Sequence, residues 1–556
     1  MGYKGTIAHT NFTLGEISPR SLGRFDADKP IFKNGAAILE NVLIGEAGAV
    51  SVRPGTQYIA NTKNQNAQAR LERFTYSIAQ EYVMEIGAQY IRFYSNTGQL
   101  QQTTAPAWVT ATPYYVGNFV SVTPAAWAGG VQYTVGTYVT HGGSVYICAI
   151  AHTSGTFNTD LAAGDWTLLP NVTSGIYYCV IAHTSGTFAT DLAAGDWVQQ
   201  IVIEIPTIFN QADIFNLQTA QKADVMYIVN PNYFPQKLIR TSATTFTISN
   251  VPFFRGPFLD SNITATTITP SIDTGTTTLT ASNPIFQLGH VGSLWRIHNG
   301  VVLITGFTSS TILVGTVQAE LNVPAVPNAW GIGQNYNIGD YVLNSGTIYR
   351  CLIGNSTSAT SVFATDLAAN YWIATSGSVG NLGTGGAATT DWSEGAFSTV
   401  RGFPSTVTFH EGHLVYGGTT YKPQTLYASA VGAYDSFDKG TGQDADAWTY
   451  EIANQQSNGI RWIESDNALQ IGTSGGSVTA QDGNQATGIT PSSPPNITYN
   501  DVYGAMTQQP VKLGGYSFFL QANKFYLRQL TYDLITSKFK DGNCGGTGVW
   551  SRDQCK

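Results

Sequence analysis

The sequence feature that most constrains this chain is a passage that occurs twice almost letter for letter. Residues 151–166 read AHTSGTFNTDLAAGDW, and residues 182–197 repeat them with Ala189 in place of Asn158. A degraded third copy, FATDLAANYW, covers residues 363–372. Each copy follows text with the alternation of a β-hairpin, so the repeat predicts small β modules rather than one continuous core.

Inside each copy, Thr-Asp-Leu followed by two alanines predicts a short helical turn that is capped by Asp or Thr. We interpret its carboxylates, Asp160, Asp191 and Asp366, as helix caps rather than catalytic groups. His152 and His183 occupy the same repeated loop, so a shared fold constraint explains both. The second copy lacks most of the first strand, which favours a partial duplication that shares one sheet with the first copy.

Each copy ends in a tryptophan, and Trp166, Trp197 and Trp372 have two interpretations. An indole ring can stack on the face of a sugar, or it can supply most of the core of so small a module. The units resemble the small three-stranded modules that are similar to carbohydrate-binding modules of chitinases and that recur in phage tail proteins. This resemblance implies a host-surface glycan as a ligand, with the three tryptophans as candidate stacking residues.

The N-terminal residues combine polar text and frequent Gly and Pro with one apolar segment. Pro19, Gly23 and Pro30 exclude a continuous helix, so residues 1–34 are predicted to form an extended arm. The alternation of Val50 and Val52 predicts the start of a strand region. Physical reasoning alone indicates an arm that ties down a β domain.

Three ordered pieces of this text, GEISPRSLGRFD, NGAAILENVLI and GAVSVRPGTQYIA, resemble the opening of the phage tail nozzle family, also called tail tubular protein B. Further similar text lies in residues 214–240 and, most densely, from Arg401 to Tyr532. The resemblance implies an arm leading into a β-propeller. After Asp533 the sequence departs from the family, which leaves a propeller that lacks its last blades or is closed by another chain.

The same resemblance implies the distal tail tube or nozzle of a short-tailed phage, which conducts and gates genome DNA and anchors fibres or spikes. The implied partners are further copies of the chain in a homohexameric ring, an adaptor or portal-side ring, tail fibres or a spike, and DNA in the lumen. The implied location is the virion tail, assembled in the host cytoplasm.

Two sets of residues are candidates for this assembly role. Residues 12–28 are expected to contact a neighbouring subunit or the adaptor, with Phe12, Glu16, Pro19, Arg20, Arg24 and Asp26 as the assembly residues. Glycine-rich loops are expected to gate the bore, with Gly383, Gly385, Gly483 and Pro494 as the candidate residues.

Low charge, at 11% of residues, together with abundant Gly, Thr, Tyr and Val predicts a mostly β chain. We expect a complete or incomplete β-propeller with inserted small β modules and a small β-barrel or sandwich domain. The predicted divisions are an arm (1–34), first propeller strands (35–104), tandem inserted modules (105–198), propeller strands (199–262), the barrel or sandwich (263–323), a third module (324–376), propeller blades (377–533) and a polar tail (534–556).

Charge and apolar patterning exclude several classes. A formal net charge of −8 without a basic cluster argues against a general nucleic-acid binder, although not against a channel through which DNA slides. Neither a membrane-spanning apolar run nor a secretory signal is found. Cys148, Cys179 and Cys351 sit in apolar strand text and are interpreted as small buried hydrophobes. The odd cysteine count fits assembly in a reducing cytosol.

No catalytic constellation emerges from the sequence. His410, Glu411 and His413 lack the helical four-residue spacing of a zinc motif, and residues 472–476 lack the context of a nucleophile elbow or a phosphate loop. Without a Cys-x-x-Cys pair or a Cys/His cluster, we expect neither a metal nor a cofactor, and we expect that the chain is not an enzyme. The alternative to the nozzle is a carbohydrate-binding tail adhesin.

Overall fold

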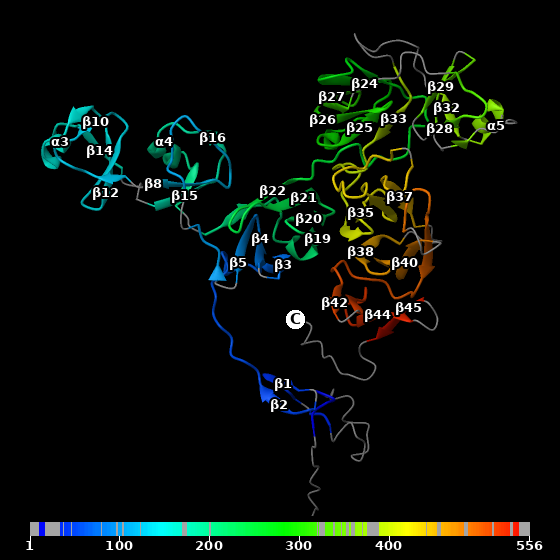
Figure 1. Cartoon of the computed structure of the whole chain (residues 1–556), viewed down its shortest axis with the longest axis horizontal. Helices are drawn as coiled ribbons and strands as arrows, with labels where there is room; N and C mark the ends of the chain where they lie inside the picture. The colour runs from blue at the N-terminus through cyan, green and yellow to red at the C-terminus, as the bar shows by residue number, and fades with distance from the viewer. Residues whose placement is uncertain are drawn as a thin grey trace, which may run out of the picture.

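The chain is mostly β in the computed structural model (Figure 1), as the sequence predicted. The structure describes residues 11–16, 34–36, 38–45, 47–78, 80–95, 98–102, 105–122, 124–169, 175–199, 202–319, 321, 329–336, 340–345, 347–351, 355–356, 362–369, 371–374, 388–440, 442–452, 458–482, 488–513, 516–533 and 538–543.

Five antiparallel sheets with four-stranded paths form the propeller part of the described chain. Sheet 1 contains β3 (Arg70–Ser77), β4 (Gln80–Gly87), β5 (Tyr90–Ser95) and β18 (Glu204–Pro206), with β6 (Gly98–Gln99) paired to β5. Sheet 2, which follows the 3-10 turn η1 (Ile214–Asn216), contains β19 (Gln218–Lys222), β20 (Val225–Asn230), β21 (Tyr233–Arg240) and β22 (Phe246–Asn250).

The other three sheets are continuous in the sequence. Sheet 3 contains β34 (Thr406–His410), β35 (His413–Gly417), β36 (Thr425–Ala428) and β37 (Trp448–Glu451). Sheet 4 contains β38 (Ile460–Ser465), β39 (Leu469–Thr473), β40 (Ser477–Asp482) and β41 (Pro495–Tyr499). Sheet 5 contains β42 (Val511–Leu513), β43 (Tyr516–Leu520), β44 (Leu527–Asp533) and β45 (Lys538–Asn543).

Successive sheets bury apolar side chains against each other, as propeller blades do. One core joins sheets 1 and 2 around Phe74, Phe93 and Ile228, and another joins sheets 3 and 4 around Leu426 and Ile471. A third core, around Tyr227 and Tyr416, joins sheets 2 and 3, and a smaller one joins sheets 4 and 5. Among the described strands, none of sheet 5 pairs with one of sheet 1. The five described sheets therefore form a propeller-like row without a strand-paired closure.

A six-stranded antiparallel sheet lies between sheets 2 and 3 in the sequence, in the order β23-β24-β27-β26-β25-β33. Its core contains the fully buried Trp295 and Leu313. The last strand comes from beyond the third repeat copy, which interrupts this domain. The elements are β23 (Ile268–Pro270), β24 (Thr276–Ala281), η2 (Leu288–His290), β25 (Leu294–Ile297), β26 (Gly300–Ser309), β27 (Ile312–Ala319) and β33 (Trp392–Glu394).

Three small modules carry the repeat copies. Module A contains β9 (Ala125–Ala126), β10 (Gln132–Tyr133), β11 (Tyr138–His141), β12 (Ser144–Cys148), β13 (His152–Thr153), α3 (Phe157–Ala162) and β14 (Trp166–Leu168). Module B contains β7 (Pro113–Tyr114), β8 (Phe119–Val122), β15 (Gly175–Cys179), β16 (His183–Thr184), α4 (Phe188–Ala193) and β17 (Trp197–Gln199). Module C contains β28 (Asn335–Tyr336), β29 (Tyr341–Asn344), β30 (Thr347–Cys351), β31 (Asn355–Ser356), α5 (Phe363–Ala368) and β32 (Trp372–Ala374).

Module A is nested inside module B, and this corrects the expectation of a sheet shared by the two copies. The first strand of module B is β8, which precedes module A in the sequence and pairs with β15, which follows it. Module A has its own four-stranded sheet in the order β14-β12-β11-β9. Figure 1 shows the two modules next to each other, to one side of the propeller sheets.

Modules A and B together interrupt sheet 1. The chain leaves this sheet after β6 and returns in β18, which pairs with β5 through Glu204 and Arg92. An isolated bridge between Gln101 and Val202 holds the outgoing and returning segments together. The pair of modules is thus attached to the propeller by two adjacent segments of chain.

Candidate carbohydrate-binding modules and their polar clusters

The repeated tryptophans lie inside the modules. Trp166, Trp197 and Trp372 are only 3%, 2% and 2% exposed. Each meets a tyrosine edge-on, with ring centroids 5.0 to 5.1 Å apart, in the pairs Tyr133–Trp166, Tyr114–Trp197 and Tyr336–Trp372. Because both faces are covered by the core, these rings cannot stack on a sugar, and the stacking prediction is wrong for all three.

A different aromatic surface is open in module A. Trp127, His141 and Phe157 line a hollow of about 320 Å³, with Gly129, Gly155, Thr156 and Asn158 completing it. The His141 ring stacks on Phe157 at 3.8 Å, and Trp127 meets His141 edge-on at 5.8 Å. Aromatic surface beside hydroxyl and amide groups is the combination that suits a sugar ring, which has apolar faces and polar edges.

In module B the corresponding face is covered. Strand pairing places Val122 where module A has His141, and Val122 is buried. Tyr138 of module A meets Trp108 edge-on at 6.4 Å, and it joins the core around Phe188 together with Val145. Burial in this contact raises the pKa of Tyr138. Module A therefore covers the surface of module B that matches its own hollow.

Module C retains part of the arrangement. Trp330 meets Phe363 edge-on at 5.6 Å, as Trp127 meets Phe157 in module A. Asn344 occupies the position of His141 in the first strand of the hairpin. Module C thus presents the tryptophan without the stacked imidazole.

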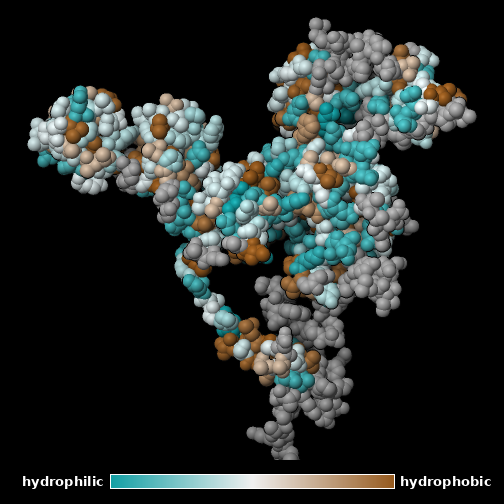
Figure 2. Space-filling view, in the orientation of Figure 1, coloured by the Kyte–Doolittle hydropathy of each residue, from teal (hydrophilic) through white to brown (hydrophobic). Residues whose placement is uncertain are grey.

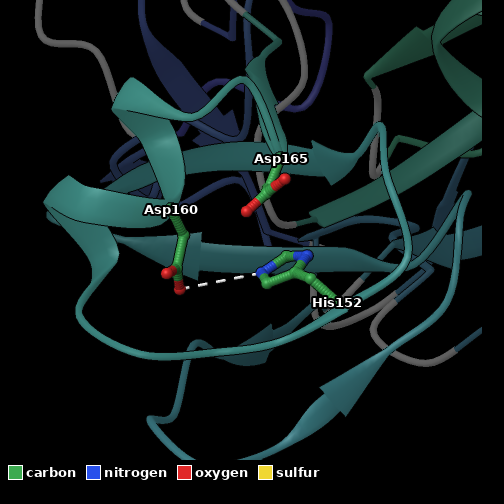
Figure 3. Close-up of side chains that lie close together, drawn as sticks. All are labelled: His152, Asp160 and Asp165. Carbon is green, nitrogen blue, oxygen red and sulfur yellow. Dashed lines mark ion pairs between the residues drawn. The ribbon is translucent and has the colours of Figure 1, made fainter.

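Module A also contains a polar cluster (Figure 3), in which His152, Asp160 and Asp165 come together. His152 comes from β13, Asp160 from the first turn of α3, and Asp165 from the residue before β14. The His152 Nε2 atom is 3.6 Å from Asp160 Oδ2, and the three residues place ligand atoms within 4.8 Å of one another. Asp160 also accepts the backbone N–H of Gly155 on both oxygens, at 3.2 and 3.0 Å.

Module B repeats the cluster with His183, Asp191 and Asp196. The His183 Nε2 to Asp191 Oδ2 distance is again 3.6 Å, and His183 Nδ1 is 4.0 Å from Asp196 Oδ2. The prediction of no metal site was based on the lack of Cys-x-x-Cys pairs and of Cys/His clusters. It did not cover a cluster of one histidine with two aspartates. The signal was present in the sequence, since each copy repeats His, Asp and Asp at the same spacing.

The predicted cap role of the repeated aspartates is only partly what the structure shows. In α4 the cap is Thr187, whose side chain accepts from the Thr190 backbone N–H. Asp191, like Asp160, instead holds the loop before the helix through the N–H of Gly186. These carboxylates therefore orient the loop that connects the histidine strand to the helix.

The His410-Glu411-Gly412-His413 motif and the cysteines have structural roles in the described part of the chain. His410 and His413 flank a two-residue turn, Glu411-Gly412, in which both residues have positive φ. His410 contacts the Ser465 hydroxyl at 2.9 Å, and His413 contacts the Ser429 carbonyl at 2.5 Å. Cys148, Cys179 and Cys351 are buried and form no disulfide with one another, and burial raises the pKa of Cys179 to about 11.

Buried charges concentrate where β33 meets the six-stranded sheet. Arg296 donates to Asp391 at 2.9 Å, and Glu394 receives Arg401 at 2.5 Å and His290 at 3.0 Å. Burial favours the neutral form of Glu394, but the hydrogen bonds from His290 and Arg401 outweigh burial and lower its pKa. Because every member is paired, this network reads as structural.

The candidate assembly and gate residues are only partly within the described chain. Phe12 and Glu16 are described: the Phe12 N–H donates to the Gly48 carbonyl, and a Glu16 carboxylate oxygen receives the Leu39 N–H at 3.1 Å. Pro494 is exposed before β41. The remaining assembly and gate candidates lie outside the described residues: Pro19, Arg20, Arg24, Asp26, Gly383, Gly385 and Gly483.

Comparisons with known proteins address the modules. Residues 126–166 match the family described as "Carbohydrate-binding module family 5/12". This segment runs from β9 to β14 and so lies in module A. No curated protein matches the chain. The fold is thus a β-rich one whose propeller-like sheets carry small modules, one of which is similar to a carbohydrate-binding family. The comparisons give no support for the tail nozzle family.

One solved structure similar to the chain is "Phage phi92 endosialidase", at 8% identity and a TM-score of 0.20. The match covers 76% of this chain and 58% of that protein. That neighbour is named as an enzyme, which contradicts the expectation that the chain is not one, and we withdraw that expectation. At this TM-score the likeness supplies no argument for an activity of this chain. Among the described helices, none is long and apolar enough to cross a membrane.

Proposed function

We propose that this protein is a carbohydrate-binding adhesin, in which a propeller scaffold holds module A away from its surface to contact glycans. The single observation that carries the proposal is the open aromatic hollow of Trp127 and His141 within the segment that matches a carbohydrate-binding family. The phage-tail setting comes from the sequence resemblance, and in that setting the ligand is a host-surface polysaccharide.

Glycan binding by the purified full-length protein tests this proposal. Binding is measured on an array of bacterial surface polysaccharides and quantified by titration of the best ligand. Trp127→Ala and His141→Val are each expected to weaken binding about fivefold, because each removes an aromatic ring contact worth about 1 kcal/mol. His141→Val reproduces the residue of module B at this position.

Tyr115→Ala is the matched control, because Tyr115 is 66% exposed on module B and lies outside the hollow. This variant should bind like the unmodified protein. A ligand that binds the Trp127 and His141 variants with unchanged affinity would place the glycan site elsewhere. Absence of any glycan ligand would refute the adhesin proposal.

A second candidate, a structural component of a tail assembly, is favoured by the N-terminal arm. The hairpin β1 (Val42–Ile44) and β2 (Val50–Val52) and its flanks expose Ile38, Val52 and Tyr58 at 68%, 82% and 72%. Figure 2 shows apolar residues gathered on this projecting segment. Exposed apolar surface of this kind typically marks a contact with another chain.

In this second candidate the arm contacts a neighbouring subunit or an adaptor ring, and a homohexameric ring conducts and gates DNA and carries fibres or a spike. Removal of residues 12–28 is then expected to abolish tail assembly while the purified chain still folds. Normal virions that carry this truncation would exclude the role of the arm. The two candidates are compatible, since the modules and the arm lie on different parts of the chain.

A further inference from the structure

We propose that the His-Asp-Asp clusters of modules A and B each bind one divalent transition-metal ion, such as Zn²⁺. The ligands are His152, Asp160 and Asp165 in module A and His183, Asp191 and Asp196 in module B. This inference is independent of glycan binding, because the aromatic hollow is lined by other side chains.

The hydrogen bonds of the histidine define the direction of its lone pair. The Nδ1 atom of His152 is 2.8 Å from the Ile150 carbonyl oxygen, and His183 has the same distance to Ile181. A carbonyl oxygen only accepts, so Nδ1 carries the hydrogen and the neutral ring has its lone pair on Nε2. This is the arrangement in which metal-bound histidines are usually held, with the other ring nitrogen donating to a backbone carbonyl.

That lone pair faces a carboxylate. In both modules Nε2 is buried without a hydrogen-bond partner and lies 3.6 Å from an aspartate oxygen. Two electron-rich atoms at this separation repel each other unless a positive charge lies between or beside them. A metal ion supplies that charge, and a proton on Nε2 is the competing solution, so the experiment must distinguish the two.

The distances suit a metal ion. Zinc bonds of about 2.0–2.2 Å in tetrahedral geometry separate two ligand atoms by about 3.4 Å. The 3.6 Å contact of His152 with Asp160 is close to this value, and one ligand atom of each of His152, Asp160 and Asp165 lies within 4.8 Å of the other two. Because Asp165 is partly exposed, water can reach the cluster and serve as a further ligand. Imidazole with two carboxylates selects a transition metal over Ca²⁺ or Mg²⁺, which prefer oxygen ligands alone.

Asp160 is already positioned for this role. Its oxygens accept the Gly155 N–H, which orients the carboxylate and leaves lone pairs available, since a carboxylate has about four acceptor sites. Asp191 has the same contacts with Gly186. The repetition in two modules shows that the arrangement belongs to the repeated text rather than to one local accident.

Module C is an internal control. It keeps Asp366 in the first turn of α5, but Asn355 stands at the histidine position in β31, and Tyr371 stands before β32 where modules A and B have aspartate. Two of the three ligands are therefore absent, and module C is expected to bind no metal at this position. The chain should bind two ions at the clusters, not three.

The test is equilibrium dialysis of the untagged full-length protein against micromolar Zn²⁺, followed by elemental analysis. The unmodified chain should retain two Zn²⁺ per molecule, and His152→Asn, which copies Asn355, should retain one. His152→Asn/His183→Asn should retain none. Failure of the unmodified chain to bind Zn²⁺, or retention of both ions by the double variant, would overturn the proposal and leave the protonated histidine as the explanation.

The variant Asp165→Asn/Asp196→Asn controls for loss of folding, because these aspartates, unlike Asp160 and Asp191, are only partly buried and asparagine has the same shape. This variant should also lose Zn²⁺ while its circular dichroism matches that of the unmodified protein. The buried cysteines remain in every variant, so zinc held by cysteine would persist in the double variants and count against the clusters. A rise in melting temperature with Zn²⁺ that chelator reverses, confined to proteins with intact clusters, provides the second readout.

Discussion

Nesting of module A in a hairpin of module B predicts that damage to one module weakens the other. Trp166→Ala removes the central ring of module A, and a buried Trp→Ala change costs about 3–5 kcal/mol. A module of about 45 residues has a stability of about 2–7 kcal/mol. The substitution is therefore expected to unfold module A, or to leave it marginal, while the propeller sheets remain folded.

The effect on module B follows from the connection between β8 and β15. In folded module A, β9 and β14 lie at opposite edges of a four-stranded sheet, about 14 Å apart at strand spacing. Unfolded, the insertion becomes a loop of about 50 residues with a mean span of about 40 Å. If folded module A acts as a spacer equivalent to about 8 residues, closing the longer loop costs module B about 1.6 kcal/mol more.

Hydrogen exchange measured by mass spectrometry tests this coupling. In Trp166→Ala, amides of β15 should exchange about tenfold faster, or more, since module B also loses its contacts with Val145 and Tyr138. Trp372→Ala is the control, because it damages module C and leaves the β8–β15 connection intact. Exchange of β15 at the unmodified rate, in a protein whose module A has unfolded, would refute the reasoning.

Three further predictions concern buried charges. Asp391→Ala should destabilise the six-stranded domain by about 3–5 kcal/mol in thermal or denaturant unfolding, because it leaves the buried Arg296 guanidinium without its carboxylate. As a control, Glu451→Gln in the exposed pair with Lys422 should change stability by less than about 1 kcal/mol. Glu394 has a lowered pKa in the folded protein, so its contribution to folding stability is present above the ordinary glutamate pKa of 4.5 and is lost as pH falls below it. Glu394→Gln should therefore make stability fall less steeply with pH on the acid side. An unchanged slope there would contradict this. Burial raises the pKa of Glu464 to about 7, so folding takes up a proton at this carboxyl and stability falls as pH rises from about 4.5 to 7. Glu464→Gln should therefore raise the melting temperature at pH 8 but not at pH 4. Equal shifts at both pH values would argue against a titrating carboxyl.

The sequence predicted the propeller-like sheets because their strands pair locally. Apolar and polar residues alternate in strands such as β39 and β40, and short turns such as Glu411-Gly412 join neighbouring strands. The register between adjacent strands then follows from the turn. What local text could not supply is the partner of β18, since β5 lies on the far side of two inserted modules.

The nesting of module A inside module B could not be predicted from neighbouring residues, for the same reason. The spacing of Trp108, Tyr114 and Phe119 equals that of Trp127, Tyr133 and Tyr138, so the first half of module B is present in the sequence. It is separated from its second half by the whole of module A, and neighbouring text therefore suggested a truncated copy. A comparison of spacings across the insertion would have recovered it.

The candidate sites show what burial adds to residue type. Sequence alone left Trp166 open between core and ligand, and only packing against Tyr133 and Phe157 decides that it is core. The tryptophan that lines the open hollow, Trp127, is not part of the repeated passage. His152 and Asp160 were visible, but their distance depends on how the loop folds back through the Gly155 N–H.

The paired attachments of the modules also determine how a pulling force would travel through this protein. A load applied at module A enters module B through β8 and β15, neighbouring strands that are joined at Val122 and Gly175. It then reaches the propeller through segments bridged at Gln101 and Val202. At each of these two attachments the force pulls both paired segments in the same direction. The two hydrogen-bonded segments therefore share the tension, and the force does not separate one from the other. A load on module A is thus shared by two paired segments at each of the two described attachments.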